Sequence, residues 1–382
     1  MSLQKKLMFI GAGWEQQPYI KKAIGMFIRT STTPLIHSRN LIYVERMFTQ
    51  HKPQAVLSDA CDYSLLAQAY LCEKYGLPGP SFDTAVLSNN KFAQREEIYQ
   101  HRIQQPFYSL CDSFIFLKNS SFSCNLPFVI KPVDGRGSLG VEKVEKEDEL
   151  KPKFFESIKH SLSRQVILEQ FIEGQVVSIE GLYSDKFYNL SYSTKTMHPD
   201  YPFNAMELQF PGNLEKKIVD KLYTLNEQII SAMGVKFGLT HTEFIIKKNG
   251  EIYFLEFTNR GGGVGISNVI LPYITGVDIC RFLITTAFGR KYGIDIKKRG
   301  YGILHFFDFG KGMLRDIKNL KNCQTIKGVL DLRITLSRGR HIPEAKTALN
   351  RHGFVIVGGK TLNDCRETIK EVEESIEIVK ST

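Results

Sequence analysis

The first part of the chain alternates short apolar runs with longer stretches of helical period. Leu7–Ile10 and Ala55–Ser58 are apolar runs typical of buried strands, whereas Gln17–Ile28 and Tyr63–Tyr75 repeat apolar residues at helical spacing. The segment Gly76–Pro80 then interrupts the chain with two prolines and two glycines. Strands that alternate with helices predict a parallel α/β layer, whose functional residues follow the carboxyl ends of the strands.

A helical pattern follows over Ser81–His101, and it breaks near Ser88–Asn90. Asparagine is a favoured N-cap, so Asn89 or Asn90 is expected to begin a second helix. Lys91 then falls in the first turn of that helix. Farther along, Leu214–Met233 has the period of an amphipathic helix.

Strand patterns dominate the middle of the chain. Phe128–Pro132 predicts a strand that leads into a loop with three glycines in the six residues Gly135–Gly140. Val166–Gly174 predicts a strand that ends in a turn, and Val176–Tyr183 with Phe187–Ser193 predicts a hairpin.

The pattern changes beyond about residue 300. Tyr301–Phe309, Val329–Leu336 and Gly353–Val357 are strand-like, and Asn363–Val379 repeats its apolar residues with a period near 3.6. These elements predict a small α/β domain that closes the chain.

The stretch Thr240–Arg260 predicts two strands joined by Asn249-Gly250, the dipeptide typical of a two-residue type I′ turn. With that loop, the register places Glu243 directly opposite Glu256, with Cβ atoms about 5 Å apart. Facing like charges are destabilising, so a cation is expected between them, and Mg²⁺ in phosphoryl-transfer sites takes such carboxylates together with phosphates. A hairpin edge on which both glutamates merely face water is the open alternative.

Composition narrows the class of protein. A length of 382 residues predicts two or three domains, and 42% apolar with 24% charged residues is ordinary for a globular protein. No run approaches the roughly 18 apolar residues that a membrane span needs, so no membrane association is expected. Seven cysteines, scattered and without a Cys-x-x-Cys spacing, favour reduced thiols in a cytoplasmic protein over a disulfide framework or zinc site.

The net charge of +10 favours anionic ligands in general. The basic residues are spread along the chain and form no Lys/Arg-rich run, and no nucleic-acid-binding module is evident. We therefore expect small anionic ligands and no nucleic-acid partner.

Lys131 and the glycine-rich loop behind it suit phosphate binding. Glycines let backbone N–H groups approach phosphate oxygens, and a lysine at a strand end supplies a positive charge. The segment is not a Walker loop, because no Gly-Lys-Ser/Thr is present in it. A flexible surface hairpin is the alternative.

Two further positions have a possible ligand role. Glu169 ends an apolar strand just before a turn, where a carboxylate can hold a ribose hydroxyl and backbone groups can read a base. Arg260 precedes three glycines, and its guanidinium can grip a substrate carboxylate with two parallel hydrogen bonds. Solvated side chains at strand ends are the alternative for both.

The order of these motifs resembles that of the ATP-grasp superfamily, in particular its carboxylate–amine ligases and carbamoyl-phosphate-synthase-like proteins. The resemblance covers roughly residues 5–300, and the carboxy-terminal stretch is similar to the small trailing domain of the family more loosely. It implies an α/β (α+β) fold of three parts: a Rossmann-like pre-ATP-grasp domain at 1–88, an ATP-grasp domain at 89–300 with a lid at about 120–190, and a small α/β domain at 301–382. The motifs are Lys91, Lys131 with Gly135–Gly140, Glu169–Gly174, and Glu243 and Glu256 with Arg260.

The resemblance also implies ATP as a ligand and assigns roles to residues. Lys91 and Lys131 would contact the phosphates. Glu169 and the backbone of Phe171 and Ile172 would hold adenosine, with Glu180 also near the nucleotide. The loop that would fold over the triphosphate contributes Gly135, Arg136, Gly137, Ser138 and Gly140.

For the metal and the reacting groups, the resemblance implies that Glu243 and Glu256 bind Mg²⁺ or Mn²⁺, and that Arg260 stabilises the substrate carboxylate and its acyl phosphate. One position departs from the family pattern, because Thr258 stands where asparagine is usual. Either the Thr258 hydroxyl supplies an oxygen to the metal, or Asn259 substitutes through a local bulge.

The implied reaction is a two-step ligation that forms a carbon–nitrogen bond (EC 6.3). A small-molecule carboxylate takes the γ-phosphoryl group of ATP, and an amine then displaces phosphate from the acyl phosphate. The segment after Lys195 lies where relatives have substrate-side loops, so His198, Glu207 and His241 are candidates for the amine side. The family is compatible with a homodimer.

Two alternatives stay open. One is a bicarbonate-phosphorylating enzyme of the carbamoyl-phosphate-synthase or carboxylase kind, although the chain shows no glutaminase or biotin-carrier segment. The other is an ATP-binding protein without catalysis. The sequence does not name the acid or the amine.

Overall fold

The amino-terminal domain is a small parallel sheet with helices beside it, as the alternating pattern predicts. The computed structural model describes residues 5–34, 37–121 and 125–381. In the sheet order β2-β1-β3, both neighbours of β1 run parallel to it. The elements are β1 (Lys6–Ile10), α1 (Gln17–Gly25), β2 (Arg29–Thr33), α2 (Leu41–His51), β3 (Ala55–Leu57) and α3 (Asp62–Tyr75).

Two helices then lead out of this domain, α4 (Phe82–Asn89) and α5 (Lys91–Gln100). Asn90 is the N-cap of α5, since its side chain accepts a hydrogen bond from the backbone N–H of Ala93. The predicted break is therefore confirmed, and Lys91 lies in the first turn.

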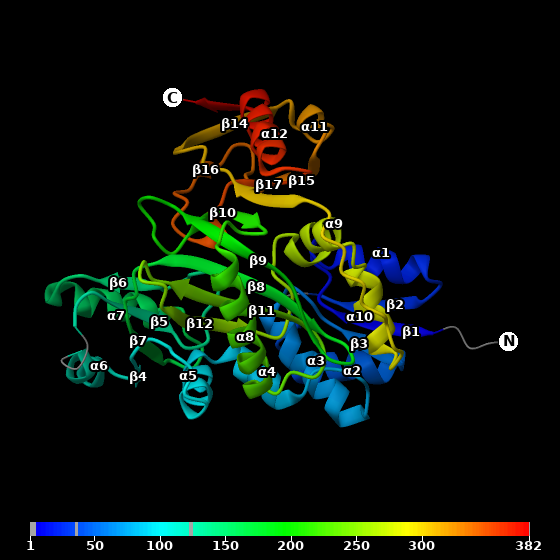
Figure 1. Ribbon diagram of the computed structural model, residues 1–382, viewed down its shortest axis with the longest axis horizontal. Helices are drawn as coiled ribbons and strands as arrows, with labels where there is room; N and C mark the ends of the chain where they lie inside the picture. The colour runs from blue at the N-terminus through cyan, green and yellow to red at the C-terminus, as the bar shows by residue number, and fades with distance from the viewer. Residues whose placement is uncertain (1–4, 35–36, 122–124, 382) are drawn as a thin grey trace.

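The next part is a four-stranded antiparallel sheet in the order β4-β7-β5-β6, with two helices against it. Its small apolar core includes Ile130, Phe154 and Leu168. Figure 1 shows this subdomain at the side of the molecule opposite the N-terminus. Its elements are β4 (Tyr108–Cys111), α6 (Phe114–Ser121), β5 (Phe128–Pro132), β6 (Glu142–Val144), α7 (Leu150–Lys159) and β7 (Val166–Gln170), with a 3₁₀ turn at Glu147–Glu149.

An eight-stranded sheet forms the centre, in the order β12-β11-β8-β9-β10-β13-β17-β15, and the pairings within it are antiparallel. Strands that follow residue 300 therefore continue the sheet that begins before it. The strands are β8 (Gln175–Tyr183), β9 (Phe187–Met197), β10 (Ala205–Phe210), β11 (Gly238–Ile246), β12 (Ile252–Thr258), β13 (Tyr301–Phe306), β15 (Val329–Ile334) and β17 (Gly353–Gly359).

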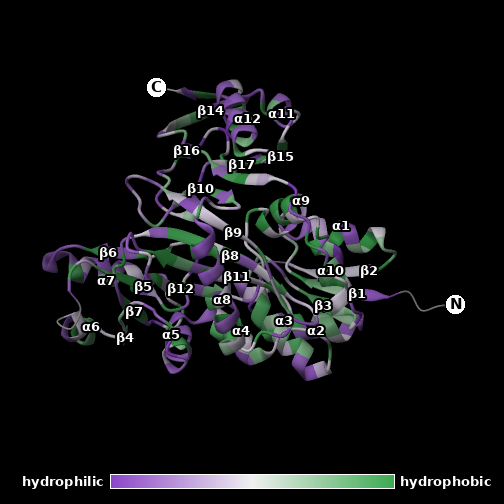
Figure 2. Cartoon of the chain, viewed as in Figure 1, coloured by the Kyte–Doolittle hydropathy of each residue, from purple (hydrophilic) through white to green (hydrophobic). Residues whose placement is uncertain are grey.

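Helices cover both faces of this sheet. On one face, α8 packs Leu222 and Ile229 against the β8–β11–β12 strands, and α12 packs Ile369 and Val372 against β13 and β17. In Figure 2, α12 is mostly hydrophilic where it is turned to solvent. The helices are α8 (Lys216–Ala232), a π-helical turn (Ile266–Ile270), α9 (Leu271–Thr275), α10 (Ile279–Ala287), α11 (Leu320–Cys323) and α12 (Leu362–Ser375), with a 3₁₀ turn at Ala348–Asn350.

The amino-terminal domain closes the other face. Phe9 of β1, Leu208 of β10 and Ile356 of β17 belong to one continuous core with residues of α9 and α10. A last small sheet, in the order β16-β14-β18, joins β14 (Gly312–Lys318), β16 (His341–Ile342) and β18 (Glu377–Ser381).

In the described part of the chain, no helix on its own is long and apolar enough to cross a membrane. The bent pair Ile266–Thr275 and Ile279–Ala287 passes that test on length and composition only.

Candidate functional site

The β11–β12 hairpin places its two glutamates as predicted, but by a different route. Glu243 is paired with Glu256. The loop between the strands has three residues rather than two, because the backbone N–H of Lys247 donates to Glu251 O at 2.9 Å and Gly250 has a φ of +84°. The predicted two-residue turn is therefore wrong, and a β-bulge between the loop and the glutamates restores the register.

Cations surround both carboxylates. Lys195 Nζ contacts Glu243 Oε1, and His241 Nε2 lies 3.0 Å from the same oxygen. Lys91 Nζ lies 3.0 Å from Glu256 Oε1. Burial would raise the pKa of Glu243, but Lys195 and His241 outweigh it and hold the pKa well below its usual range.

His241 is held by a second acid beneath it. Its Nδ1 lies 2.5 Å from Glu180 Oε1, and Gly262 N–H donates to the other oxygen of this fully buried carboxylate at 3.2 Å. Burial lowers the pKa of His241, but Glu180 and Glu243 outweigh it and raise the pKa to about 9. Glu180, which was predicted near the nucleotide, thus contacts His241 and Gly262.

Thr258 and Asn259 point to different surroundings. The Thr258 hydroxyl lies 3.2 Å from Asp62 Oδ1, close to Arg260. The Asn259 amide instead donates to the carbonyls of Phe237 and Leu239 at 2.9 and 2.7 Å. These contacts favour Thr258 as the side chain that accompanies the two glutamates.

The donor set of this face fits a hard divalent cation. Two carboxylates and a hydroxyl are oxygen ligands, which Mg²⁺ and Mn²⁺ prefer, and phosphates usually complete such a site. Among the residues that the structure describes, no group of three or more His, Cys, Asp or Glu side chains is arranged to hold a metal ion.

Lys131 and Glu169, predicted for different parts of the nucleotide, contact each other. Lys131 Nζ lies 2.7 Å from Glu169 Oε2, and Arg95 Nε lies 2.9 Å from Oε1. All three side chains are nearly inaccessible to solvent. Burial lowers the pKa of Lys131, and Glu169 offsets this only in part. Arg95 was not predicted, although it lies one helical turn after Lys91 on α5.

The glycine-rich loop lies across the site and touches several parts of the molecule. Lys91 Nζ donates to Gly135 O at 2.6 Å, and Ser138 Oγ donates to Phe203 O at 2.7 Å. The Arg136 guanidinium lies over the ring of Tyr63. Gly140 has a φ of +68°, where a Cβ atom would approach Pro132 and His160 at 3.0 Å, so glycine is required there.

The hinge between the four-stranded sheet and the central sheet runs through Phe171 and Ile172. Phe171 N–H donates to Pro127 O at 3.4 Å, and Ile172 is buried. Gly174 approaches β11 closely, since a Cβ atom there would lie 2.4 Å from Ile246 O.

Arg260 is gripped by an acid of the amino-terminal domain. Its Nε and Nη2 donate to the two oxygens of Asp62 at 2.6 and 3.2 Å. Nearby, Asp59 accepts from Gly261 N–H at 2.8 Å, and Glu15 accepts from Val264 N–H. The sequence did not single out these acids, but Glu15 follows β1 and Asp59 and Asp62 follow β3, at the strand ends where ligand-binding residues are expected.

Two of the candidates for the amine side form ion pairs and hydrogen bonds away from the glutamate pair. His198 Nε2 lies 3.3 Å from Asp308, and its Nδ1 accepts from Asp200 N–H. Glu207 is paired with Arg366 of α12, on the face of the sheet opposite the glutamate pair. Of the three histidine and glutamate candidates, His241 alone contacts a residue of the glutamate pair in the described chain.

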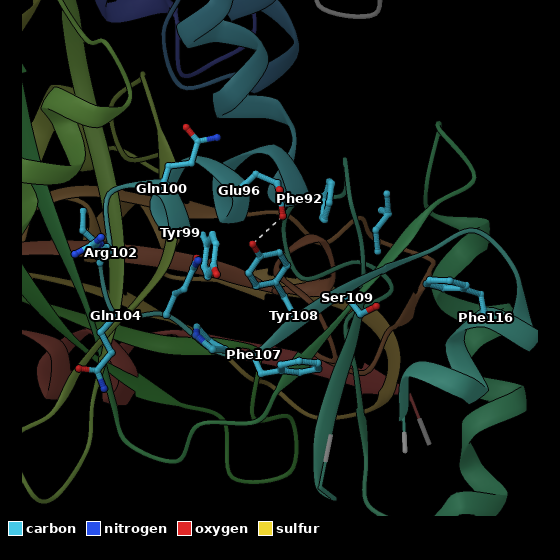
Figure 3. A pocket seen from close by; sticks show the side chains of 14 residues that line it. Phe92, Glu96, Tyr99, Gln100, Arg102, Gln104, Phe107, Tyr108, Ser109 and Phe116 are labelled. Carbon is cyan, nitrogen blue, oxygen red and sulfur yellow. Dashed lines mark hydrogen bonds between the residues drawn. The ribbon is translucent and has the colours of Figure 1, made fainter. Parts of the chain in front are cut away.

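A separate pocket lies between α5 and β4, lined by aromatic and amide side chains including Tyr99, Gln104 and Phe107 (Figure 3). Tyr108 donates to Glu96 at 2.7 Å in its wall. None of the predicted site residues lines it.

Comparisons with known proteins identify the type of domain and the fold. A family model described as an ATP-grasp domain matches residues 124–268, and one described as L-amino acid ligase C-terminal domain 2 matches residues 305–380. The crystal structure of L-amino acid ligase from Bacillus licheniformis superposes with a TM-score of 0.85 at 20% identity, and the match covers 100% of both chains. The biotin carboxylase domain of the Hydrogenobacter thermophilus 2-oxoglutarate carboxylase superposes at 0.79 with 17% identity, covering 100% of this chain and 92% of that one.

Among related sequences, protein y4rH of Sinorhizobium fredii is 23% identical over 80% of this chain, which spans 64% of that protein. The L-arginine-specific L-amino acid ligase of Bacillus subtilis is 20% identical over 84% of this chain and 77% of its own length. The predicted ATP-grasp fold and the predicted kinship with ATP-grasp ligases are confirmed. The substrates are not identified by these matches.

Proposed function

We propose that this chain, an ATP-grasp protein with an L-amino acid ligase C-terminal domain, joins a small-molecule carboxylate to an amine with ATP. The observation that carries the proposal is the facing pair Glu243 and Glu256, with lysines on both sides and Arg260 beside them. A carboxylate oxygen attacks the γ-phosphorus, and ADP leaves. The amine nitrogen then attacks the acyl carbon, loses a proton and expels phosphate.

The lysines have positions suited to the phosphates. Lys91 contacts Glu256, and Lys131 lies close enough to both for their charges to interact. Lys195 contacts Glu243, so each glutamate of the pair has positive charge beside it. Such preorganised charges lower the barrier to phosphoryl transfer. Glu243, Glu256 and the Thr258 hydroxyl would hold Mg²⁺, which would neutralise charge on the phosphates.

Arg260 is the group we assign to the substrate carboxylate. Its guanidinium already binds a carboxylate with two parallel hydrogen bonds, that of Asp62, so the geometry for bidentate recognition exists. Asp62 then either shares the guanidinium with the substrate or releases it. The glycine-rich loop, by lying across the site, would keep water from the acyl phosphate.

An amino acid is the carboxylate that the surroundings favour. Glu15 lies close enough to Arg260 for their charges to interact, and burial raises the pKa of its carboxyl group. A substrate ammonium beside Glu15 would oppose that effect by favouring the carboxylate form. A substrate that places a carboxylate at Arg260 and an ammonium at Glu15 has the two charges of an α-amino acid. The L-amino acid ligases among the relatives support the same class.

The test measures ADP release with Mg²⁺, ATP and pairs of amino acids, with bicarbonate as a separate arm. Release that requires a carboxylate together with an amine supports the proposal. Release with bicarbonate alone would support carboxyphosphate chemistry, and nucleotide binding without release on any arm would contradict ligation.

Variants of the site sharpen that test. Glu256→Gln and Lys131→Ala are each expected to lower ADP release about 100-fold or more, because each removes a charge that opposes the transferring phosphoryl group. Glu251→Gln is the matched control, since this exposed glutamate lies on the same hairpin and pairs with Lys247. Near-normal release by Glu256→Gln would refute its role.

A further inference from the structure

The segment before β17 sends one arginine, Arg351, toward the central sheet. Its Nε donates to Asn204 Oδ1 at 2.9 Å and its Nη2 to Ala205 O at 2.7 Å. The guanidinium lies 3.7 Å from the ring centre of Phe306. Both acceptors are neutral, and no carboxylate in the described chain lies within 4.0 Å of Arg351. A largely buried cation therefore lacks an anionic partner.

Strand pairing places Arg351 on the face that carries the glutamate pair. Directly paired residues share a face, and so do residues two apart on one strand. Glu243 pairs with Ser178, and Ser178 with Ser193, so Lys195 lies on the face of Glu243.

The same rule extends the face to the carboxy-terminal strands. Lys195 pairs with Leu208, and Leu208 pairs with Leu304, two residues before Phe306. Phe306, and with it the guanidinium of Arg351, therefore lies on the face of Glu243. The charge of Glu243 is close enough to favour the protonated arginine, although burial outweighs it and lowers the pKa of Arg351 to about 10.

Arg351 lies on the side of this face away from Lys91. In the strand order, β12 with Glu256 is at the edge beside Lys91, whereas Arg351 bonds to the start of β10, four strands away. With about 4.8 Å between neighbouring strands, that separation is roughly 19 Å. The lysines that we assign to the phosphates lie nearer to the glutamates than Arg351 does. Arg351 is therefore on the part of this face that remains for the second substrate.

We propose that Arg351 is the residue that selects an amino acid as the nucleophile, by binding its carboxylate. This inference rests on the proposed ligase function. A guanidinium stacked on an aromatic ring is held in one plane, and its free edge matches a carboxylate, which accepts two parallel hydrogen bonds. An amino acid anchored there by its carboxylate presents its amino group toward Lys195 and Glu243, where the acyl phosphate forms.

The experiment separates the two half-reactions by the nucleophile. Wild type is first screened for ADP release with all pairs of the twenty common L-amino acids. For the best pair, three nucleophiles are compared in wild type and Arg351→Gln: the amino acid, its carboxamide, and hydroxylamine, which traps the acyl phosphate as a hydroxamate. For the amino acid, KM is expected to rise about 10- to 100-fold in Arg351→Gln, the loss typical of hydrogen bonds to a charged group.

For the carboxamide and hydroxylamine, KM and kcat are expected to change less than about 3-fold between wild type and Arg351→Gln, since neither has a carboxylate to lose. Arg351→Lys keeps the positive charge but not the planar guanidinium. Its KM for the amino acid is therefore expected to lie between those of wild type and Arg351→Gln. Arg351→Lys also keeps the test decisive if Arg351→Gln does not fold. Arg366→Gln is the matched control, because this arginine of α12 pairs with Glu207 on the opposite face of the sheet.

Three outcomes would overturn the inference while leaving the ligase intact. One is an equal loss with all three nucleophiles, which would place Arg351 at the phosphoryl group or make it purely structural. Another is an unchanged KM for the amino acid. The third is a wild type that accepts hydroxylamine but no amino acid as nucleophile. Absence of both ADP release and hydroxamate in wild type would instead refute the proposed function, and the inference with it.

Discussion

Glu169 holds two cations in a place that water hardly reaches. Its side chain is 3% exposed, that of Arg95 1% and that of Lys131 7%. Burial would raise the pKa of Glu169, but Arg95 and Lys131 outweigh it and lower the pKa. One carboxylate balances only one of the two charges, so the cluster keeps a net positive charge. An arriving phosphate would supply the missing negative charge.

Replacing Glu169 by glutamine should therefore destabilise the fold as well as the site. Two buried cations would lose their counter-ion, and breaking a buried ion pair by removing one partner costs about 3–5 kcal/mol. We expect Glu169→Gln to lower the free energy of unfolding by that amount in urea denaturation at neutral pH. Glu251→Gln, on an exposed pair, should change it by less than about 1 kcal/mol. A loss no larger than that of this control would mean that the cluster is solvated in solution.

At the scale of elements, the glycine-rich loop connects parts that are far apart in the sequence. Its Arg136 lies over Tyr63 at the start of α3, its Ser138 contacts Phe203, and Gly135 contacts Lys91 of α5. The ring of Tyr63 also contacts Arg39. The loop thus docks on the amino-terminal domain through one arginine side chain, while glycines give its backbone the required turns.

Removing the Arg136 side chain should loosen the lid, while the lysines that we assign to the phosphates stay in place. We expect Arg136→Ala to lower kcat about 10-fold and to raise the ratio of ADP released to amide formed, because water reaches an acyl phosphate that is less well covered. The ratio is measured by assaying both products in one reaction. Lys159→Ala, exposed on α7 of the same subdomain, serves as the control. An unchanged ratio would mean that Arg136 does not hold the lid closed.

The elements also show what the sequence could and could not predict. The register of a two-residue Asn249-Gly250 loop predicted Glu243 opposite Glu256. The pairing is right only because the three-residue loop and the β-bulge shift the register in opposite directions, and local pattern predicts neither of them. Strand β2 was missed, since its sequence Arg29–Thr33 is polar and only its pairing with β1 makes it a strand. The bond between Arg95 and Glu169 joins positions 74 residues apart, a distance over which local pattern carries no information.

On the scale of the whole molecule, the carboxy-terminal segment is part of the central sheet. Its strand β13 pairs with β10 from Phe210–Gly302 to Glu207–His305, and β17 pairs with β13 in turn. A change of pattern near residue 300 predicted a small α/β domain, but edge-to-edge pairing of two segments leaves no trace in either sequence. The main core likewise joins residues of β1, β10 and β17.

A chain that ends at residue 300 should therefore not fold to a soluble protein. It would lose the buried side chains of Leu304, Phe306, Phe354 and Ile356 from the main core. At about 1.5–3 kcal/mol for each side chain, that loss approaches the roughly 5–15 kcal/mol by which domains are stable. It would also leave β10 as an open edge, which favours aggregation.

A chain that ends at residue 376 is the matched control, because it lacks only β18 of the small outer sheet. We expect the longer chain to stay soluble with a cooperative thermal transition, and the shorter one to sediment after lysis. A soluble, cooperatively melting chain of 300 residues would show that the central sheet is complete at β10.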